Sequence, residues 1–260
     1  MLSSPLPPES RTLREATSAV DYFARVSEIV RDFETALDPI RAVELLEEAT
    51  LRMGAEVAVF ASFIRDDDRC ESYRLLLACD PRWCVEYEQL ARFTDDPWLN
   101  YARHHSEPVR GSEIETESST ERALVELAER FGFRSSVVVP APSSAGLSRL
   151  GVLCLGSSWP GYFEAEGYVE FKVVARSVAM ELHEWWIARL KDDLILAAQL
   201  TESDLALLAH ERQGHGTKAI ARLLGTSTGA IDSRFQRIIA KLGVPSRKAA
   251  ARLAAEYGLI

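Results

Sequence analysis

Polar side chains that could contact DNA lie on one face of a predicted helix near the end of the chain. Within residues 227–242, apolar residues recur at i, i+4, i+7 and i+11 (Ile231, Phe235, Ile238, Leu242), which predicts a buried stripe. The opposite face carries Thr228, Asp232, Ser233, Gln236, Arg237 and Lys241. Short polar groups and Gln can read base edges, while Arg and Lys bind phosphates. An ordinary solvated helix face would show the same pattern. The neighbouring elements must therefore distinguish a DNA-binding helix from a solvated one.

Two shorter helices are predicted before this one. The run Thr201-x-x-Asp204 is typical of a capping box, with a hydroxyl cap and an acid in the first turn. Thr217 is a candidate cap for the second helix, Gly225 supplies a turn, and Ser227 is a candidate cap for the third. Three short helices with a glycine turn are typical of a helix-turn-helix. The candidate DNA-contacting residues are Thr217, Lys218, Ser227, Thr228, Asp232, Ser233, Gln236, Arg237 and Lys241.

Charge is divided unevenly along the chain. The 260 residues have a net charge of −9, but residues 200–260 hold nine Lys/Arg against five Asp/Glu, so this end is +4 and the rest −13. Such an asymmetry suits a small basic DNA-binding module joined to an acidic sensor. We therefore expect double-stranded DNA as a partner. The expected organisation is a flexible N-terminus over 1–19, a sensor domain over 20–190, a linker over 191–199 and a DNA-binding domain over 200–260.

The first 190 residues are predicted to contain both helices and strands. β-formers predict strands over 56–64, 73–78, 135–139 and 150–155, and helical patterns cover 20–51, 81–102 (with a break), 120–130 and 163–190. Polar loops are expected at 66–68, 104–119 and 140–148. The prediction is an α+β fold: an N-terminal α-β-α sandwich with an antiparallel sheet, then a C-terminal all-α helix-turn-helix domain. The stripe Phe171, Val174, Val178 and Leu182 could be internal core or a dimer seam.

No group of residues predicts catalysis or a bound metal. The sequence shows no nucleophile–base pair, no Gly-rich phosphate loop and no zinc spacing among Cys70, Cys79, Cys84 and Cys154, which we expect to be free thiols. We expect no signal peptide, because the first residues lack a basic stretch followed by an apolar one, and the sequence has no apolar run of about 18 residues. We expect a cytoplasmic protein that is not an enzyme, has no metal or cofactor and does not bind a membrane.

An aromatic pair and an acid–proline dipeptide stand in the middle of the sensor region. Trp83 and Tyr87 are one helical turn apart, which by itself is typical of a buried pair. Asp96-Pro97 is a common helix start, with Asp as the N-cap and Pro in the first turn. Taken alone, these residues predict structure and not a site.

The last sixty residues resemble the LuxR-type helix-turn-helix domain along their full length. The resemblance rests on Leu200-Thr201, Asp204 (usually Glu in the family), Leu208, Gly214, Ile220-Ala221, Ile231 and Lys241-Leu242-Gly243-Val244. It implies a homodimer that reads two DNA half-sites. Arg234 stands where relatives often have His, so no target sequence can be carried over.

The sensor region resembles the autoinducer-binding domain of quorum-sensing regulators. Trp83, Tyr87 and Asp96 have the family's spacing, and residues 132–140 and 153–157 are similar to its later motifs. The resemblance implies a pocket for an acyl-homoserine lactone. Asp96 would accept the amide N–H and Trp83 would donate its indole N–H to the ring carbonyl. Tyr87 would contact the acyl carbonyl or line the tail.

Four positions depart from this family pattern. Gly111 stands where the family usually has an aromatic residue, and Cys79 stands where it often has Tyr. Cys154 stands where the family often has Ser or Thr, and Trp98 where a small residue is common. Trp98 could replace the missing ring or fill the cavity. The candidate ligand-binding residues are Trp83, Tyr87, Asp96, Trp98, Cys79 and Cys154.

Three hypotheses follow from the departures. The first is a transcriptional regulator of quorum-sensing type whose sensor binds an acyl-homoserine lactone or a related signal. The second is a LuxR-type regulator that acts without a ligand because its pocket is filled. The third is an interaction module that silences a related regulator by mixed dimerisation.

Overall fold

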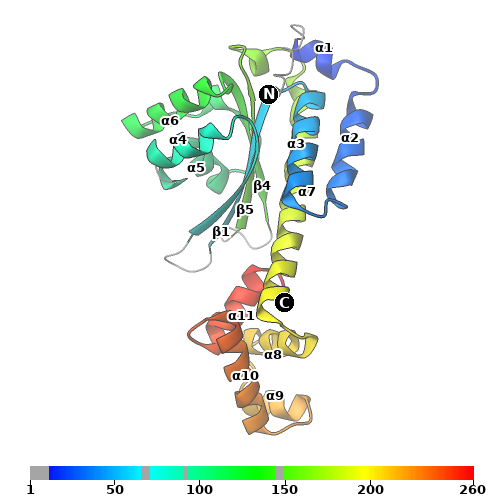
Figure 1. Ribbon diagram of the computed structural model, residues 1–260, viewed down its shortest axis with the longest axis vertical. Helices are drawn as coiled ribbons and strands as arrows, with labels where there is room; N and C mark the ends of the chain where they lie inside the picture. The colour runs from blue at the N-terminus through cyan, green and yellow to red at the C-terminus, as the bar shows by residue number, and fades with distance from the viewer. Residues whose placement is uncertain (1–11, 66–70, 91–92, 144–148) are drawn as a thin grey trace. The chain divides into compact units, whose positions relative to one another are not determined.

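A five-stranded sheet lies between two layers of helices in the computed structural model of this protein (Figure 1). The strands are β1 (Val57–Arg65), β2 (Glu71–Ala78), β3 (Val109–Arg110), β4 (Ser135–Pro142) and β5 (Arg149–Ser157), in the order β2-β1-β5-β4-β3. β5 pairs antiparallel with both β1 and β4, and β3 pairs antiparallel with β4. The predicted antiparallel sheet is confirmed. The short strand β3 and the 3-10 turn η2 (Gly111–Glu113) lie where a loop was expected.

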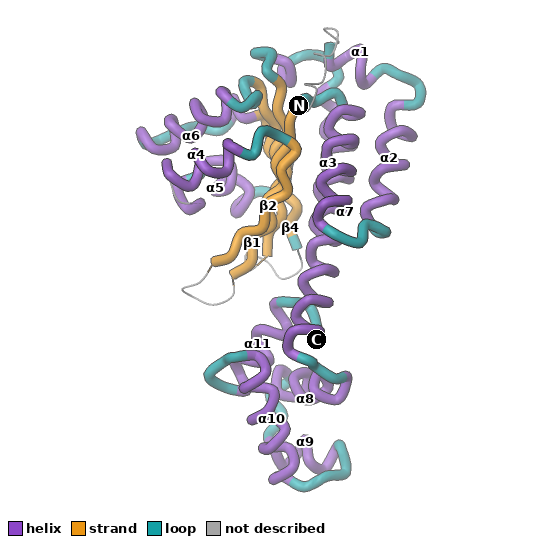
Figure 2. Tube along the Cα trace, in the orientation of Figure 1, coloured by secondary structure: helices purple, strands orange, loops and turns teal. Residues whose placement is uncertain are grey.

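Helices cover both faces of this sheet (Figure 2). One face is covered by α2 (Tyr22–Phe33), α3 (Pro39–Met53) and the first part of α7 (Tyr168–Ala198). The other is covered by α4 (Arg82–Leu90), α5 (Pro97–His104) and α6 (Ser119–Arg130), with the 3-10 turn η1 (Phe93–Asp95) between α4 and α5. The predicted α-β-α sandwich is therefore confirmed.

The structure describes residues 12–65, 71–90, 93–143 and 149–260. The expected polar turn at 66–68 and most of the expected loop at 140–148 lie outside the described residues. The chain divides into two compact units, one of residues 1–64 and 72–184 and the other of residues 65–71 and 185–260. None of the described helices is long and apolar enough to cross a membrane.

The single helical stretch expected over residues 20–51 is two helices. α2 ends at Phe33, and Asp38 begins α3 as its N-cap, because its side chain accepts the backbone N–H of Arg41 at 2.9 Å. Pro39 follows at the first helical position, where its fixed φ fits and its missing N–H costs nothing. A short helix, α1 (Leu13–Thr17), also forms within the stretch 1–19, and its Leu13 is fully buried.

The apolar stripe of α7 is internal core. Phe171, Val174, Val178 and Leu182 are at most 5% exposed within a single chain. A seam between two copies would leave this stripe exposed in one chain, so of the two interpretations the structure favours the core. The 3-10 turn η4 (Tyr162–Glu164) precedes the helix and buries Phe163 against Phe171, with ring centroids 4.8 Å apart.

Four helices form the second unit after α7. They are α8 (Glu202–Arg212), α9 (Thr217–Leu223), α10 (Thr228–Leu242) and α11 (Arg247–Glu256). Their shared core contains Leu207, Leu208, Ile220, Ala221, Ile231, Phe235, Ile238, Ala250, Ala251 and Ala254. The caps expected at Thr201 and Ser227 form, but Gly216, not Thr217, occupies the N-cap of α9. Thr217 is the first helical residue, and its hydroxyl donates to Asp232 at 3.3 Å.

Candidate functional site

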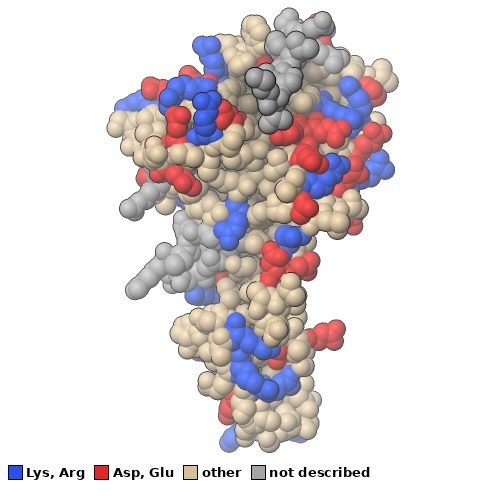
Figure 3. Space-filling view, in the orientation of Figure 1, with Lys and Arg blue, Asp and Glu red and all other residues tan. Residues whose placement is uncertain are grey.

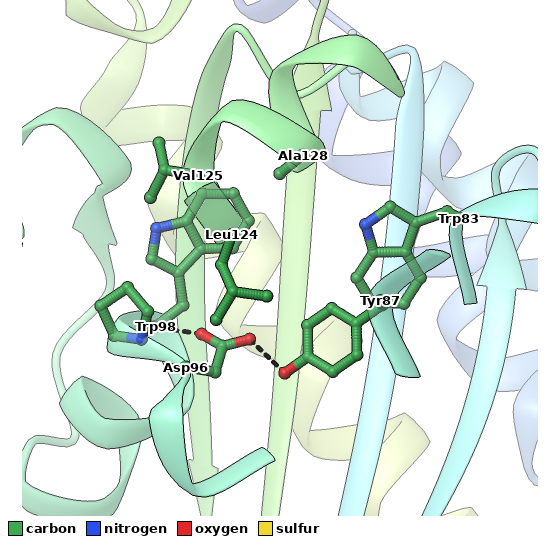
Figure 4. Close-up of a pocket in the computed structure, with 8 residues that line it drawn as sticks. Trp83, Tyr87, Asp96, Trp98, Leu124, Val125 and Ala128 are labelled. Carbon is green, nitrogen blue, oxygen red and sulfur yellow. Dashed lines mark hydrogen bonds between the residues drawn. The ribbon is translucent and has the colours of Figure 1, made fainter. Parts of the chain in front are cut away.

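A buried carboxylate lies at the centre of the candidate site in the first unit. Asp96 is the N-cap of α5, and its Oδ1 accepts the backbone N–H groups of Trp98 at 2.8 Å and Leu99 at 3.2 Å. Its Oδ2 accepts the hydroxyl of Tyr87 from α4 at 2.6 Å (Figure 4). The sequence places a carboxylate here as a cap, and the fold adds the phenol from a neighbouring helix.

Burial dominates the electrostatics of this pair. Asp96 is 8% exposed, and desolvation raises the pKa of its carboxyl, although the hydrogen bonds from Tyr87, Leu99 and Trp98 act in the opposite direction. Desolvation, and then the nearby Asp96, raises the pKa of Tyr87 far above its usual value. Tyr87 therefore stays protonated and remains a hydrogen-bond donor at neutral pH.

Aromatic and aliphatic side chains form the walls of two small cavities beside Asp96. Trp83, Tyr87, Asp96 and Trp98 line both. The first is completed by Pro97, Leu124, Val125 and Ala128, and the second by Val59, Ala61, Leu75, Phe93, Leu99, Phe133 and Cys154. The cavity volume is about 20 Å³ in the first and about 30 Å³ in the second. Since a buried water molecule needs roughly 10–15 Å³, each cavity has room for only a few waters.

Two hydrogen-bond donors in these walls have no partner among the described residues. The indole N–H groups of Trp83 and Trp98 are buried and form no hydrogen bond. Each of the two side chains is 8% exposed. In Figure 4 both rings border the same space as the Asp96–Tyr87 pair. An unpaired buried donor is rare in folded proteins, and ligands or water commonly satisfy such groups.

Trp98 lies against Gly111. The family usually has an aromatic residue at this position. A Cβ atom built on Gly111 would be 3.5 Å from Cζ2 of Trp98 and would overlap Oγ of Ser136. The Trp98 ring also lies 6.1 Å from the ring of Phe133, centroid to centroid. A side chain at position 111 would therefore overlap the Ser136 hydroxyl and lie against the indole of Trp98, which lines both cavities.

The two candidate cysteines differ in position. Cys154 on β5 is buried, lines the second cavity and faces Val59 and Val138 in the strand register. Burial, and then the charge of Asp96, raises the pKa of its thiol, so the thiol stays neutral. Cys79 is half-buried and packs against the surrounding hydrophobic cluster, but it does not line either cavity. Burial, then Asp80, raises the pKa of Cys79 to about 12.

Several wall residues were not predicted from the sequence. Phe93 follows α4 in the 3-10 turn η1 and stacks on Tyr73 with ring centroids 3.7 Å apart, while its centroid lies 5.2 Å from that of Tyr87. Leu124, Val125 and Ala128 come from α6, a helix with no polar motif to mark it. Ordinary apolar residues of this kind can be assigned to a pocket only when the fold is known.

Most of the candidate DNA-contacting residues are exposed on the second unit. Lys218, Ser227, Thr228, Asp232, Ser233, Gln236, Arg237 and Lys241 are exposed, and Thr217 is half-buried. The side chains of Lys218 and Arg237 form no hydrogen bond or ion pair with any described residue. Figure 3 shows Lys and Arg side chains gathered over α8 to α11. Lys218 and Arg237 are therefore exposed cations available to contact DNA phosphates.

Lys241 is engaged within the protein. Its Nζ donates to the carbonyl of Gln199 at 2.6 Å and to Oδ2 of Asp204 at 3.2 Å. Asp204 also accepts from the backbone N–H of Thr201 at 3.1 Å and lies 3.8 Å from Arg234, which in turn donates to Ser203. Burial alone would raise the pKa of Asp204, but the hydrogen bonds from Thr201 and Lys241 outweigh it and lower that pKa. Lys241 thus ties α10 to the start of α8.

Arg247 is a central residue of this unit that the site prediction omitted. From α11, its guanidinium donates to the Thr217 hydroxyl at 2.9 Å and lies 3.7 Å from Asp232 and 3.9 Å from Glu211. It also lies over the ring of Phe235, 5.1 Å from the centroid. Two candidate DNA contacts, Thr217 and Asp232, are therefore held by Arg247.

Comparison with known proteins gives one family and several structures of the same fold. Residues 40–171 match the family described as the autoinducer binding domain. A protein of Sinorhizobium fredii (strain NBRC 101917 / NGR234), y4qH, whose name describes an HTH-type transcriptional regulator, is 23% identical over 257 residues, which cover 92% of this chain and 74% of that protein.

Three solved structures are similar to the fold. Escherichia coli SdiA has a TM-score of 0.73 at 16% identity, covering 92% of this chain and 99% of its own. SdiA in complex with octanoyl-rac-glycerol has a TM-score of 0.71 at 15% identity, covering 92% and 97%. CepR2 of Burkholderia cenocepacia, titled an N-acylhomoserine lactone dependent LuxR family transcription factor, has a TM-score of 0.55 at 18% identity, covering 65% and 98%.

Proposed function

The chain belongs to the autoinducer-binding domain family, and on this premise we propose that it is a DNA-binding transcriptional regulator of quorum-sensing type. In this proposal the first unit binds an acyl-homoserine lactone or a related small signal next to Asp96, and helices α9 and α10 of the second unit bind double-stranded DNA. The protein acts as a homodimer, in the cytoplasm, and is not an enzyme.

The observation that most favours signal binding is the combination of Asp96 with two unpaired indole donors in one apolar wall. A small-molecule site needs apolar walls and a few fixed polar groups. Asp96 is held in place by α5 and Tyr87, so its orientation is set before any ligand arrives. An amide N–H would find the carboxyl oxygens of Asp96 there, and carbonyl oxygens would find the indole N–H groups of Trp83 and Trp98.

A second candidate function is regulation without a ligand. The small cavities favour it, because cavities with room for a few waters cannot hold an acyl chain without movement of side chains. In this alternative Trp98 is a permanent part of the core. Under the first proposal, Trp98 or its neighbours must move when the ligand binds.

Thermal melting separates these two functions. The full-length protein is melted alone and with acyl-homoserine lactones of several chain lengths, and with octanoyl-rac-glycerol because an SdiA structure contains it. A ligand at a hundred times its Kd should add about 2.7 kcal/mol of stability. Extraction of the purified protein and mass spectrometry detect a signal that was already bound. No shift and no extracted ligand would leave the ligand-independent function.

The DNA-binding half is tested separately. Binding to a fluorescent duplex is measured for wild type and for Asp96→Asn, with and without ligand. Asp96→Asn keeps the caps of α5 but removes the charge, so it should weaken the response to a ligand while leaving intrinsic DNA binding intact. Absence of DNA binding under all these conditions, at low salt, would contradict the proposal.

A further inference from the structure

Two histidines of the second unit meet between α8 and α9 (Figure 1). His210 lies in the last turn of α8, and His215 lies in the connection that leads to α9. Their Nδ1 atoms are 3.1 Å apart, and the planes of their rings are inclined by 44°. The proposed function uses neither residue.

The backbone at the end of α8 brings these two side chains together. The N–H of His215 donates to the carbonyl of His210 at 3.1 Å, and the N–H of Gly214 donates to that of Glu211 at 3.0 Å. Gly214 has a φ of 79°, in the left-handed region that commonly ends a helix. The two imidazoles are therefore placed by the local fold before any ion binds.

The spacing of the two nitrogens fits a single metal ion. Imidazole nitrogens bind transition metals at about 2.0–2.1 Å, so two of them on one ion lie roughly 2.9–3.4 Å apart for square-planar to tetrahedral angles. The observed 3.1 Å is within this range. When the two rings bond to each other, one Nδ1 donates and the other accepts. If that proton moves to Nε2 of its ring, both Nδ1 atoms present lone pairs, and an ion can take the place of the proton.

Access and charge favour a cation at this position. Both histidines are half-buried, so solvent reaches them. A cation at the C-terminal end of a helix is stabilised by the helix dipole. Glu211, the acid next to His210 in the chain, lies 3.9 Å from Arg247 and belongs to that ion pair. Since no group of three or more His, Cys, Asp or Glu side chains comes together among the described residues, water must complete the coordination.

We infer that His210 and His215 form an exchangeable site for a divalent transition-metal cation that prefers imidazole, such as Zn²⁺, Ni²⁺ or Cu²⁺. Two protein ligands with water bind less tightly than the four ligands of a structural zinc site, so the ion is reversibly bound. The bound ion links the end of α8 to the connection before α9. Mg²⁺ and Ca²⁺ prefer oxygen ligands and do not compete.

The sequence predicted no bound metal, because neither histidine belongs to a zinc-binding spacing. The pair becomes visible only when the left-handed turn at Gly214 is known. The inference is independent of both the small signal and the DNA of the proposed function.

Calorimetry with NiCl₂ tests the site on the full-length protein without a histidine tag. The variants are His210→Gln, His215→Gln and the double variant, each of which keeps a polar side chain. His104→Gln is the matched control, because His104 is exposed and its Nδ1 is bonded to the backbone carbonyl of Asn100 at 2.8 Å.

Wild type and His104→Gln should each bind one more Ni²⁺ ion than the double variant, with the same Kd. In each single variant the Kd of this ion should rise by about 10- to 100-fold or more, because the loss of a ligand costs at least as much as the loss of a group that supports a ligand. If the double variant binds Ni²⁺ as wild type does, or if wild type binds none, the inference is overturned and the proposed function is unaffected.

A second measurement needs no variant. The amides of Gly214 and His215 form the hydrogen bonds of the turn, so their hydrogen exchange, followed by NMR, should slow when ZnCl₂ is added and recover with EDTA. The amide of Gly54, which donates to Leu51 at the end of α3 in the first unit, is the reference and should not respond. Unchanged exchange at Gly214 and His215, or equal slowing at Gly54, would show that no ion bridges the two histidines.

Discussion

The indole ring of Trp98 lies beside Gly111, within van der Waals contact of the position that a Cβ atom would take. An added Cβ at Gly111 would touch Cζ2 of Trp98 at 3.5 Å and would overlap Ser136 Oγ. Trp98 is itself anchored, because its backbone N–H binds Asp96. Glycine at position 111 therefore leaves room for the Ser136 hydroxyl, with the Trp98 ring beside it.

Gly111→Ala should therefore destabilise the first unit. The new methyl group forces Ser136 to move inside a packed wall, and such overpacking costs about 1–3 kcal/mol. Removing the obstructing hydroxyl in Gly111→Ala/Ser136→Ala should recover most of the loss. The free energy of unfolding is measured in urea.

Gly229→Ala is the matched control for this change. Gly229 lies in α10 with nothing within 4 Å of the added Cβ, so alanine should stabilise that helix by about 0.5–1 kcal/mol. Equal destabilisation by the single and double changes at positions 111 and 136 would contradict the steric argument.

The buried Asp96 should give stability a dependence on pH. Its pKa in the folded protein is raised above the ordinary value of 3.8, mainly by desolvation. Compared with the unfolded state, the folded state therefore shifts the carboxyl of Asp96 toward its protonated form. The stability that this group contributes is fully present below 3.8 and is lost as the pH rises through the raised folded value.

Melting of wild type and Asp96→Asn between pH 4 and pH 8 measures this effect. Asparagine keeps an oxygen for the backbone caps but does not ionise, so the two proteins share every other titrating group. The melting temperature of wild type relative to the variant should fall as the pH rises. A difference that stays constant over the whole range would show that Asp96 has an ordinary pKa.

Capping rules and periodicity predicted the helices that hold the site, but they did not predict which side chains contact one another in it. Asp96 was predicted as a helix cap from the following proline, and the cap forms. The partnership of Asp96 with Tyr87 joins two helices, and no rule of sequence spacing determines it without a family precedent. Likewise the sequence left two roles open for Trp98, because the direction of its ring depends on the space beside Gly111.

The second unit shows the same limit. Ser227 caps α10 as predicted, since a cap is a matter of neighbouring residues. Lys241 was predicted to face DNA from its place on the polar side of the helix. Its amine instead binds the carbonyl of Gln199, a residue 42 positions earlier that has a left-handed φ of 46°. A helical period identifies which side chains are exposed, but it does not identify whether they contact DNA or another part of the protein.

Lys241→Met should lower the stability of the second unit. The change removes the hydrogen bonds to Gln199 and Asp204 and leaves the alkyl stem in place, so the loss should be about 0.5–1.5 kcal/mol. Lys248→Met is the control, because Lys248 is exposed and its side chain forms no hydrogen bond or ion pair with the described residues. If both variants unfold at the same urea concentration as wild type, Lys241 is free for DNA, as first predicted.

Removing a cation that binds a DNA phosphate should change the salt dependence of DNA binding, whereas removing a cation that only positions other residues should not. Lys218→Met and Arg237→Met remove exposed charges with no partner among the described residues. Each should reduce the slope of log K against log salt by about 0.9 if it contacts one phosphate. The measurement uses a duplex selected from random sequences by the wild-type protein.

Arg247→Met should weaken binding to the same duplex without this change in slope. Arg247 holds Thr217 at 2.9 Å and lies 3.7 Å from Asp232, so its loss frees two residues of the proposed DNA-binding face. Methionine can still pack on Phe235, which limits the effect on folding. Affinity for the selected duplex should fall about 5- to 10-fold, while affinity for an unrelated duplex changes little. A slope reduced as in Lys218→Met would identify Arg247 as a direct phosphate contact and contradict its role in positioning Thr217 and Asp232.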